Sequence, residues 1–133
     1  MKLAGDTAIS VGKLGTIEFT AGYYIYTGSA FGPGGLKSRV GRHLKHSKKC
    51  HWHIDSLRKF AEVQEIWYTF HPEKVECRWS EIFKAMRNAR ILCPGFGSSD
   101  CRCESHLFFF KKKPGFTVFK RKTKVAVLCS VCE

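Results

Sequence analysis

The chain has 133 residues, of which 44% are hydrophobic, and these values suit one folded domain rather than a disordered segment. Its 23 lysine and arginine residues exceed its 11 acidic residues and give a net charge of +12, which favours a polyanionic partner, with nucleic acid ahead of an anionic membrane surface. The longest apolar runs are too short to cross a bilayer and no secretory signal opens the sequence, so we expect a cytoplasmic protein without a membrane partner.

The first strands are expected near the start of the chain. Apolar and polar residues alternate over residues 15–19, residues 21–22 allow a turn, and residues 23–27 are aromatic or β-branched. This pattern predicts a β-hairpin. A glycine-rich loop then follows over residues 28–35.

Three later segments have the spacing of helices. Their apolar residues recur every three or four positions, as they do on one face of a helix. These segments and their apolar positions are residues 36–44 (Leu36, Val40, Leu44), residues 54–61 (Ile54, Leu57, Ala61) and residues 75–86 (Val75, Trp79, Ile82, Phe83, Met86).

Short apolar runs predict further strands. They are residues 63–70, 107–110, 116–119 and 125–128, and a loop of small residues over 95–105 precedes the last three. The order of elements is typical of an α+β domain with a small, mostly antiparallel sheet flanked by helices. The basic residues 111–113, followed by Pro114 and Gly115, separate the body of the domain, residues 1–110, from a basic C-terminal β appendage, residues 111–133.

Four side chains are candidates for a catalytic site. Arg39 and His43 of the first predicted helix lie beside its apolar stripe, at the edge that meets the sheet, and Tyr26 ends the preceding strand. A tyrosine, an arginine and a histidine together supply a proton acceptor, a fixed cation and a proton relay, which phosphodiester hydrolysis requires. Glu76 borders the apolar arc of the third helix, where one carboxylate can hold Mg²⁺ if a substrate phosphate completes the coordination. Each of these residue types, taken singly, is more often a packing or surface residue.

The stretch from the first to the second helix is basic and interleaved with histidine and tryptophan. Such a composition suits contact with a phosphate backbone and stacking on bases. The residues expected to bind nucleic acid are Lys37, Arg42, Lys45, His46, Lys48, Lys49, His51 and His53. A transition-metal site at His51, His53 and Asp55 is a weaker alternative, because their spacing suits a strand or turn rather than a helix.

The seven cysteines, in a chain without a secretory signal, predict thiols rather than disulfides. A Cys-x-x-Cys pair at Cys129 and Cys132 is half of a zinc site. Cys101, Cys103 and His106 crowd one loop with Cys93 nearby, and these four residues are the other possible zinc ligands. A Cys-x-Cys pair followed by histidine is not a standard zinc-ribbon spacing, so buried or free thiols are favoured over zinc.

Several long motifs occur together and in a fixed order. They are GYYIYTGSA at residues 22–30, GPGGL at 32–36, Arg39 with Arg42 and His43, HWHID at 51–55, and GFGSSDCRCESHL at 95–107. Over roughly residues 10–110 these motifs resemble an uncharacterised domain family related to the GIY-YIG nucleases, whose members occur alone or fused to a DNA-repair glycosylase. The resemblance implies a three-stranded antiparallel sheet flanked by helices.

The resemblance also implies roles for individual residues. Tyr26 corresponds to the tyrosine of the second nuclease motif, which activates water with the help of neighbouring basic groups. Arg39 corresponds to the helix arginine that stabilises the pentavalent phosphate, His43 to the histidine that follows it, and Glu76 to the glutamate that binds Mg²⁺ or Mn²⁺. The implied function is a divalent-metal-dependent DNA endonuclease in DNA repair or processing.

One strand of the nuclease pattern is not found in the sequence. GIY-YIG enzymes carry their first tyrosine on a separate preceding strand, whereas residues 22–24 and 26–28 of this chain lie on a single strand. Two explanations stay open: the strand lies upstream of Met1, or the protein lacks it and retains binding without cleavage. A non-catalytic nucleic-acid-binding module and a zinc-stabilised interaction domain are therefore the alternative functions.

Overall fold

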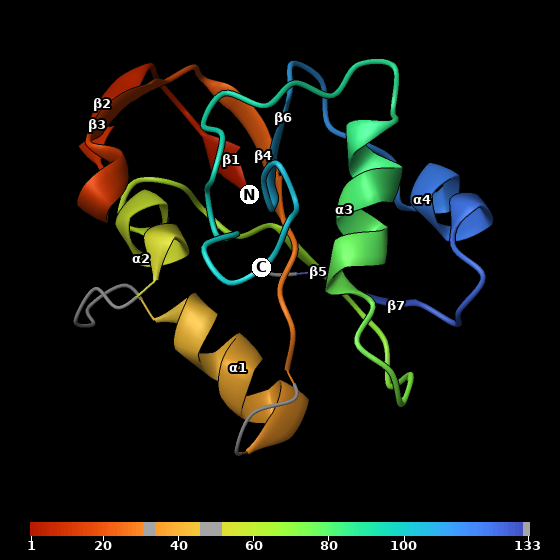
Figure 1. Ribbon diagram of the computed structural model, residues 1–133. Coiled ribbons are helices and arrows are strands. Elements are labelled where there is room, and N and C mark those ends of the chain that lie inside the picture. Colours follow the sequence, from red (N-terminus) through yellow and green to blue (C-terminus); the bar gives the residue numbers. More distant parts are fainter. Residues whose placement is uncertain (31–33, 46–51, 132–133) are drawn as a thin grey trace.

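A three-stranded antiparallel sheet forms the middle of the computed structural model (Figure 1), which describes residues 1–30, 34–45 and 52–131. Its central strand is β4 (Gly22–Tyr26), which pairs with β1 (Lys2–Leu3) on one side and with β6 (Leu107–Phe110) on the other. The pairing of β4 with β6 runs from Tyr23 opposite Phe110 to Tyr26 opposite Leu107. The α+β class and the small antiparallel sheet expected from the sequence are confirmed.

Successive side chains of β4 and β6 alternate between the two faces of this sheet. Tyr24, Leu107 and Phe109 are buried in one apolar cluster, and Phe108 and Phe110 are buried in a second cluster on the other side. Every residue of β6 is buried, because both faces of the sheet are covered.

One face is covered by α2 (His53–Arg58) and a hairpin, and α1 (Gly35–Leu44) lies next to α2 at the end of β4 (Figure 1). The hairpin consists of β2 (Thr7–Ser10) and β3 (Thr16–Phe19), with the 3-10 helix η1 (Gly12–Leu14) between its strands. The apolar cluster on this side includes Ile9, Phe19, Ile54 and Leu57. We call this side the α1 face.

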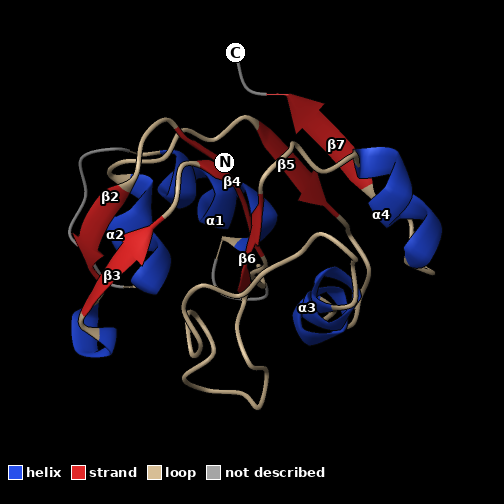
Figure 2. Ribbon diagram, turned by 90° about the horizontal axis from the view of Figure 1, so that it is seen from above, coloured by secondary structure: helices blue, strands red, loops and turns tan. Residues whose placement is uncertain are grey.

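The opposite face, which we call the α3 face, is covered by α3 (Glu76–Lys84) and α4 (Phe116–Lys122). Beside these helices lies a two-stranded sheet of β5 (Glu65–Tyr68) and β7 (Leu128–Val131). Seen from above, β2, β3 and α2 lie across β4 and β6 from β5, β7 and α4 (Figure 2).

The hairpin expected from residues 15–19 and 23–27 is wrong. β3 pairs with β2 instead, and β4 belongs to the central sheet. The chain turns between the two sheets where the N–H of Ala21 donates to Asp6 Oδ1 at 2.7 Å. Phe19 and Tyr24 then meet edge to face in the core, with ring centroids 5.9 Å apart, rather than as neighbours on paired strands.

The strand expected at residues 116–119 is also wrong, because these residues begin helix α4. A helix places Phe116 and Phe119 on the same side, whereas a strand would send them to opposite faces. Both rings lie against Trp67, with centroid separations of 5.3 and 5.4 Å. Packing on the core therefore overrides the β propensity of this run.

The remaining predicted elements are found, with shifts at their ends. Helices α1, α2 and α3 and strands β5 and β6 lie where the apolar spacing places them, and residues 95–105 form a loop. The last strand, β7, begins three residues later than expected, at the position where it pairs with β5. In the described part of the chain, every helix is too short or too polar to cross a membrane.

Candidate functional site

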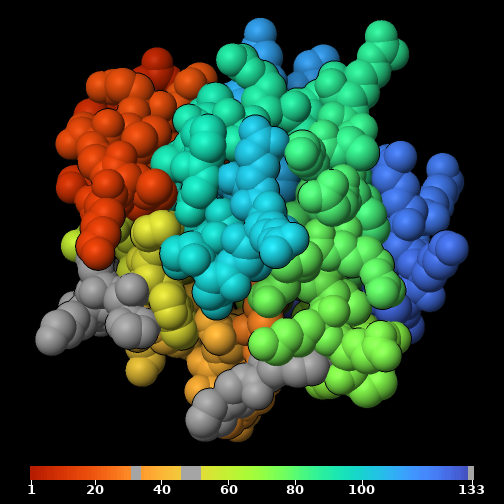
Figure 3. All heavy atoms as spheres, viewed as in Figure 1, coloured from red at the N-terminus to blue at the C-terminus, as the bar shows by residue number. Residues whose placement is uncertain are grey.

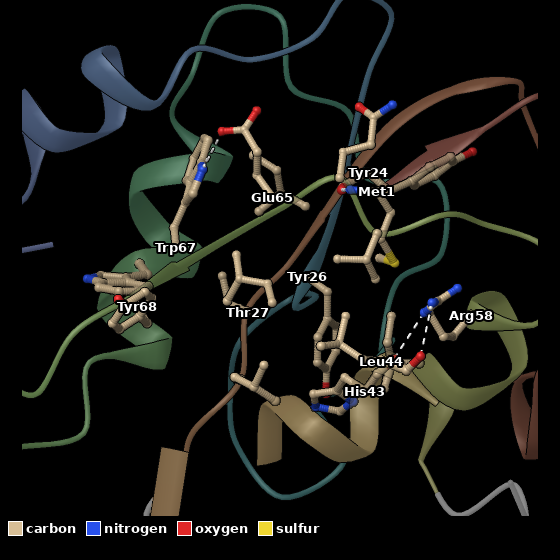
Figure 4. A pocket seen from close by; sticks show the side chains of 18 of the residues that line it. Met1, Tyr24, Tyr26, Thr27, His43, Leu44, Arg58, Glu65, Trp67 and Tyr68 are labelled. Atoms are coloured by element: carbon tan, nitrogen blue, oxygen red, sulfur yellow. Dashed lines mark hydrogen bonds between the residues drawn. The ribbon is translucent and has the colours of Figure 1, made fainter. Parts of the chain in front are cut away.

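Tyr26, at the end of β4, points toward α1 (Figure 4). Its ring meets the His43 imidazole edge to face, with ring centroids 5.8 Å apart. Arg39 precedes His43 by about one helical turn, and all three side chains line a cavity of about 210 Å³ between β4, α1 and β5. The tyrosine, arginine and histidine singled out in the sequence therefore share one cavity.

Burial raises the pKa of the Tyr26 phenol to about 12 and is the largest of the effects on it. The positive charge of Arg39 lowers this pKa, and the negative charges of Glu76, Asp55 and Asp100 raise it. The phenol is therefore protonated at neutral pH and acts as a hydrogen-bond or proton donor. An additional positive charge beside it, such as a metal ion, would lower the pKa.

Cation–π and ionic contacts hold α1 against the start of α2. The guanidinium carbons of Arg39 and Arg42 lie 4.2 and 4.6 Å from the centroid of the Trp52 ring. Arg42 also pairs at 2.8 Å with the fully buried carboxylate of Asp55, and this carboxylate accepts the backbone N–H of Trp52 at 2.9 Å. These contacts orient the side of α1 that carries Arg39.

A buried arginine, Arg58, closes the C-terminal end of α1. Its guanidinium donates to the carbonyls of His43 and Leu44 at 3.0 and 3.3 Å (Figure 4). It also donates to the carbonyl of Ala61 at 2.7 Å. The last carbonyls of a helix have no partner within the helix, and a cation satisfies both their hydrogen bonds and the helix dipole. Arg58 thereby positions the backbone of His43 beside Tyr26.

A second group of reactive side chains lies on the α3 face. The thiols of Cys77, Cys101 and Cys103 and the imidazole of His106 each offer one ligand atom, and these atoms all lie within 4.8 Å of one another. Cys77 belongs to the first turn of α3, the other two thiols to the loop over residues 95–105, and His106 directly precedes β6. Three thiols and an imidazole are a donor set that suits zinc, so this group is able to hold a metal ion.

His106 is buried and has three polar neighbours. Its Nδ1 lies 2.7 Å from Thr27 Oγ1 and 2.6 Å from Ser80 Oγ, and its Nε2 lies 3.1 Å from Cys101 Sγ. Burial lowers the pKa of the His106 imidazole, and burial is also the main reason that the pKa of the Cys103 thiol is raised to about 12. Both shifts favour the neutral side chains.

The sequence model of one protein family, described as a domain of unknown function and designated DUF123, matches residues 1–127. This chain belongs to the DUF123 family. The expected membership of an uncharacterised domain family is thus confirmed. No curated protein and no solved structure matches the chain. Because the family match spans both faces of the central sheet, the Tyr26 cavity and the Cys–His group both belong to the DUF123 domain.

Glu76 of this DUF123 domain lines a different cavity from Tyr26. It begins α3 and borders a neighbouring cavity of about 230 Å³, together with Gly28 and Ser29. Its charge nevertheless acts on the Tyr26 phenol. In the described part of the chain, no group of three metal-ligating side chains includes Glu76. Glu76 therefore offers a single carboxylate, which suffices for Mg²⁺ only when phosphate oxygens and water supply the other ligands.

The residues expected to bind nucleic acid differ in their surroundings. Lys37 and Lys45 are exposed, on α1 and just after it. Arg42 is engaged in the contacts with α2 described above, and His53 accepts the N–H of Gly97 at its Nδ1, 2.8 Å away. His53 therefore anchors a loop. The other four expected residues lie outside the described residues: His46, Lys48, Lys49 and His51.

The Cys–His group differs in one member from the set expected in the sequence. Cys101, Cys103 and His106 belong to the group, but Cys93 is buried in the apolar cluster of the α1 face. Cys77 takes its place. Local spacing could not identify Cys77, because only the packing of α3 beside the loop brings this thiol to the other three ligands.

Proposed function

We propose that the Tyr26 cavity is the active site of a divalent-metal-dependent DNA endonuclease, related to the GIY-YIG nucleases, that acts in DNA repair or processing. The observation that best supports this function is the contact between the Tyr26 phenol and the His43 imidazole in a cavity that Arg39 also lines. These groups provide a proton donor, a proton acceptor and a fixed cation in one place. Phosphodiester hydrolysis requires this combination.

Each of the three side chains has a distinct role in the proposed reaction. The positive charge of Arg39 stabilises the negative charge that develops on the pentavalent phosphate. His43 accepts the proton that the attacking water gives up, directly or through the hydroxyl of Tyr26. The net charge of +12 attracts the anionic backbone of DNA to the protein.

Glu76 is the residue that would hold Mg²⁺ or Mn²⁺. The ion, when bound, neutralises charge on the phosphate and on the leaving oxygen. Glu76 supplies a carboxylate oxygen, which is the kind of ligand that these hard cations prefer, and its charge acts on the Tyr26 phenol.

DNA cleavage assays with the purified protein test this function. Branched, nicked and plain DNA are incubated with Mg²⁺ or Mn²⁺, and Arg39→Ala is compared with Arg121→Ala, which removes the same charge from an exposed position on α4. We expect cleavage by the wild type, a loss of about 10²–10³-fold in Arg39→Ala, and no loss in Arg121→Ala. Circular dichroism verifies that both variants are folded. Absence of cleavage on every substrate, or equal cleavage by Arg39→Ala, would contradict the proposal.

Tyr26→Phe separates proton transfer from packing. This variant keeps the ring that contacts His43 and removes only the hydroxyl. We expect the cleavage rate to fall by about 10²-fold or more, while DNA affinity stays the same. A rate equal to that of the wild type would remove the phenol from the proposed mechanism.

A nucleic-acid-binding module without catalysis is the second candidate. It is supported by β1, which has two residues, pairs with Gly22 and Tyr23 of β4 and contains no tyrosine. The described residues therefore provide no tyrosine on a strand that precedes β4 in this sheet. DNA binding that weakens steeply with salt, without metal-dependent turnover, would select this function over the nuclease.

A further inference from the structure

We infer that Cys77, Cys101, Cys103 and His106 bind one structural zinc ion, and that this ion holds the loop over residues 95–105 against Tyr26. Zinc binding at this group does not require the proposed nuclease activity.

The four side chains have the composition of a structural zinc site, and the distances between their ligand atoms suit such a site. Structural zinc is bound tetrahedrally by four Cys or His ligands, with Zn–S distances of about 2.3 Å and Zn–N distances of about 2.0–2.1 Å. The ligand atoms of such a site lie about 3.5–3.8 Å apart, and the four atoms in this protein lie within 4.8 Å of one another. Small side-chain rotations therefore bring them onto one ion. Because the protein supplies all four ligands, the ion has no open position for a substrate.

His106 is oriented as a zinc ligand. Its Nδ1 lies within hydrogen-bond distance of the hydroxyls of Thr27 and Ser80, and its Nε2 faces the thiols. When Nδ1–H donates to a hydroxyl, the lone pair of Nε2 is directed at the thiols. Histidines that bind metals almost always have such an outer hydrogen bond, which sets the tautomer and orients the ring.

The compactness of the group favours a single ion over an iron–sulfur cluster. Ligands on two different irons are separated by bridging sulfides and lie farther apart than the ligands of one ion. Thiol and imidazole donors also disfavour Mg²⁺ and Ca²⁺, which require oxygen ligands. Zinc combines the preferred donors with the preferred four-coordinate geometry.

The ion would join segments that are distant in the sequence. Cys77 lies on α3, Cys101 and Cys103 lie in the loop, and His106 connects through Thr27 to the end of β4. The loop crosses the front of the molecule between α2 and α3 (Figure 3). It contains no helix or strand. A metal crosslink would order such a segment in the way that buried apolar contacts order a helix.

The same loop packs directly on Tyr26. A methyl group added at Gly97 would lie 3.0 Å from Tyr26 Cε1, so the loop backbone touches the ring. The N–H of Gly97 donates to His53 Nδ1 at 2.8 Å. His53 therefore holds one part of the loop, and zinc at Cys101 and Cys103 would hold the other.

Metal analysis of the purified full chain tests zinc binding. Protein produced with added zinc is expected to contain one zinc per chain, and Cys103→Ser is expected to contain none. Cys129→Ser is the control, because Cys129 is an exposed thiol on β7 that belongs to the Cys-x-x-Cys pair and not to this group of four. This control is expected to keep its zinc. A wild type without zinc, a wild type with iron in its place, or Cys103→Ser with full zinc content would overturn the inference.

Cobalt substitution tests the same site without relying on a variant that fails to fold. Zinc-free wild type titrated with Co²⁺ should develop the intense visible absorption of a tetrahedral thiolate complex, saturating at one equivalent, and Zn²⁺ should displace it. Ser80→Ala keeps all four ligands but removes one hydroxyl from Nδ1, so it should weaken zinc binding by about 10-fold. Absence of thiolate–cobalt absorption would overturn the site, and an unchanged affinity in Ser80→Ala would overturn the orientation assigned to His106.

Amide hydrogen exchange tests the effect of zinc on the loop. Removal of zinc should accelerate exchange over residues 95–105 and leave β4 and β6 protected. Equal exchange with and without zinc would overturn the part of the inference that concerns Tyr26. None of these measurements uses DNA, so they can fail or succeed regardless of the nuclease assays.

Discussion

The helices on the two faces of the central sheet are held in place by different interactions. On the α3 face, aromatic rings pack on one another: Phe119 stacks on Phe83 at 4.6 Å and meets Trp79 edge to face at 5.0 Å. On the α1 face, the buried charged residues Asp55 and Arg58 hold α1 through hydrogen bonds. The cavity that Tyr26 lines lies between these two kinds of packing, since it is bordered by Arg39 of α1 and by the aromatic side chains of Trp79 and Phe83 of α3.

Residues at the end of β4 make contacts on both faces of the sheet. Tyr26 contacts His43 on the α1 face, and the next residue, Thr27, bonds to His106 on the α3 face. Side chains alternate along a strand, so two consecutive residues contact two different sites. We therefore expect that loss of a ligand at the Cys–His group alters the packing around Tyr26, through β4 and through the loop at Gly97.

Removal of the centre of the aromatic packing should have the largest effect on stability. Phe119→Ala deletes a fully buried ring and should lower the free energy of unfolding by about 3–5 kcal/mol. Val118→Ala, at an exposed position of the same helix, should change the free energy of unfolding by less than about 0.5 kcal/mol. Urea denaturation followed by circular dichroism measures both. Equal effects would show that α4 does not pack through Phe119.

Loss of the buried cation should destabilise the α1 face almost as strongly. Arg58→Met leaves the carbonyls of His43, Leu44 and Ala61 without their donor and should lower the free energy of unfolding by about 2–4 kcal/mol. Lys59→Met removes a charge from the neighbouring exposed residue and should have little effect. The same urea denaturation compares the two variants. A loss in Arg58→Met no larger than that in Lys59→Met would mean that charged contacts do not hold this face.

The pKa of the Tyr26 phenol measures how far its surroundings exclude water. The phenolate absorbance of the wild type minus that of Tyr26→Phe should have its midpoint at about pH 12, well above the ordinary tyrosine pKa of 10.0. Since the folded state favours the neutral phenol, this group stabilises the protein fully below pH 10 and loses that contribution as the pH rises through 12. Arg39→Ala should move the midpoint still higher, because the cation lowers the pKa. A midpoint near 10 would indicate an open, solvated phenol.

The smallest effect on stability is expected from loss of the ion pair between Lys113 and Glu65. Glu65 belongs to β5, and both residues line the cavity. Lys113 lowers the pKa of the Glu65 carboxyl below 4.5, so the pair stabilises the protein above that pH and loses its effect as the pH falls through the lowered pKa. Lys113→Ala should return the pKa of Glu65 toward its usual value, as measured by NMR titration. Lys112→Ala, at an exposed neighbouring residue, should leave it unchanged.

Much of the Tyr26 site could be predicted from local sequence. The four-residue spacing of Arg39 and His43 places both on one side of a helix, and the glycine-rich connection returns that helix to the end of the strand that carries Tyr26. These are short-range relationships. The buried salt bridge of Asp55 and the capping role of Arg58 could not be predicted, because both depend on how α2 meets α1.

The sequence by itself determined the α+β class, the positions of the helices with regular apolar spacing, and the strand over residues 107–110, since periodicity and propensity act over a few neighbouring residues. Tertiary structure decided the partner of β3, the helix at residues 116–119, and the entry of Cys77 into the Cys–His group in place of Cys93. The physical reason is that strand pairing, the burial of Phe119 and the assembly of distant ligands depend on contacts between segments far apart in the chain, which local patterns do not encode.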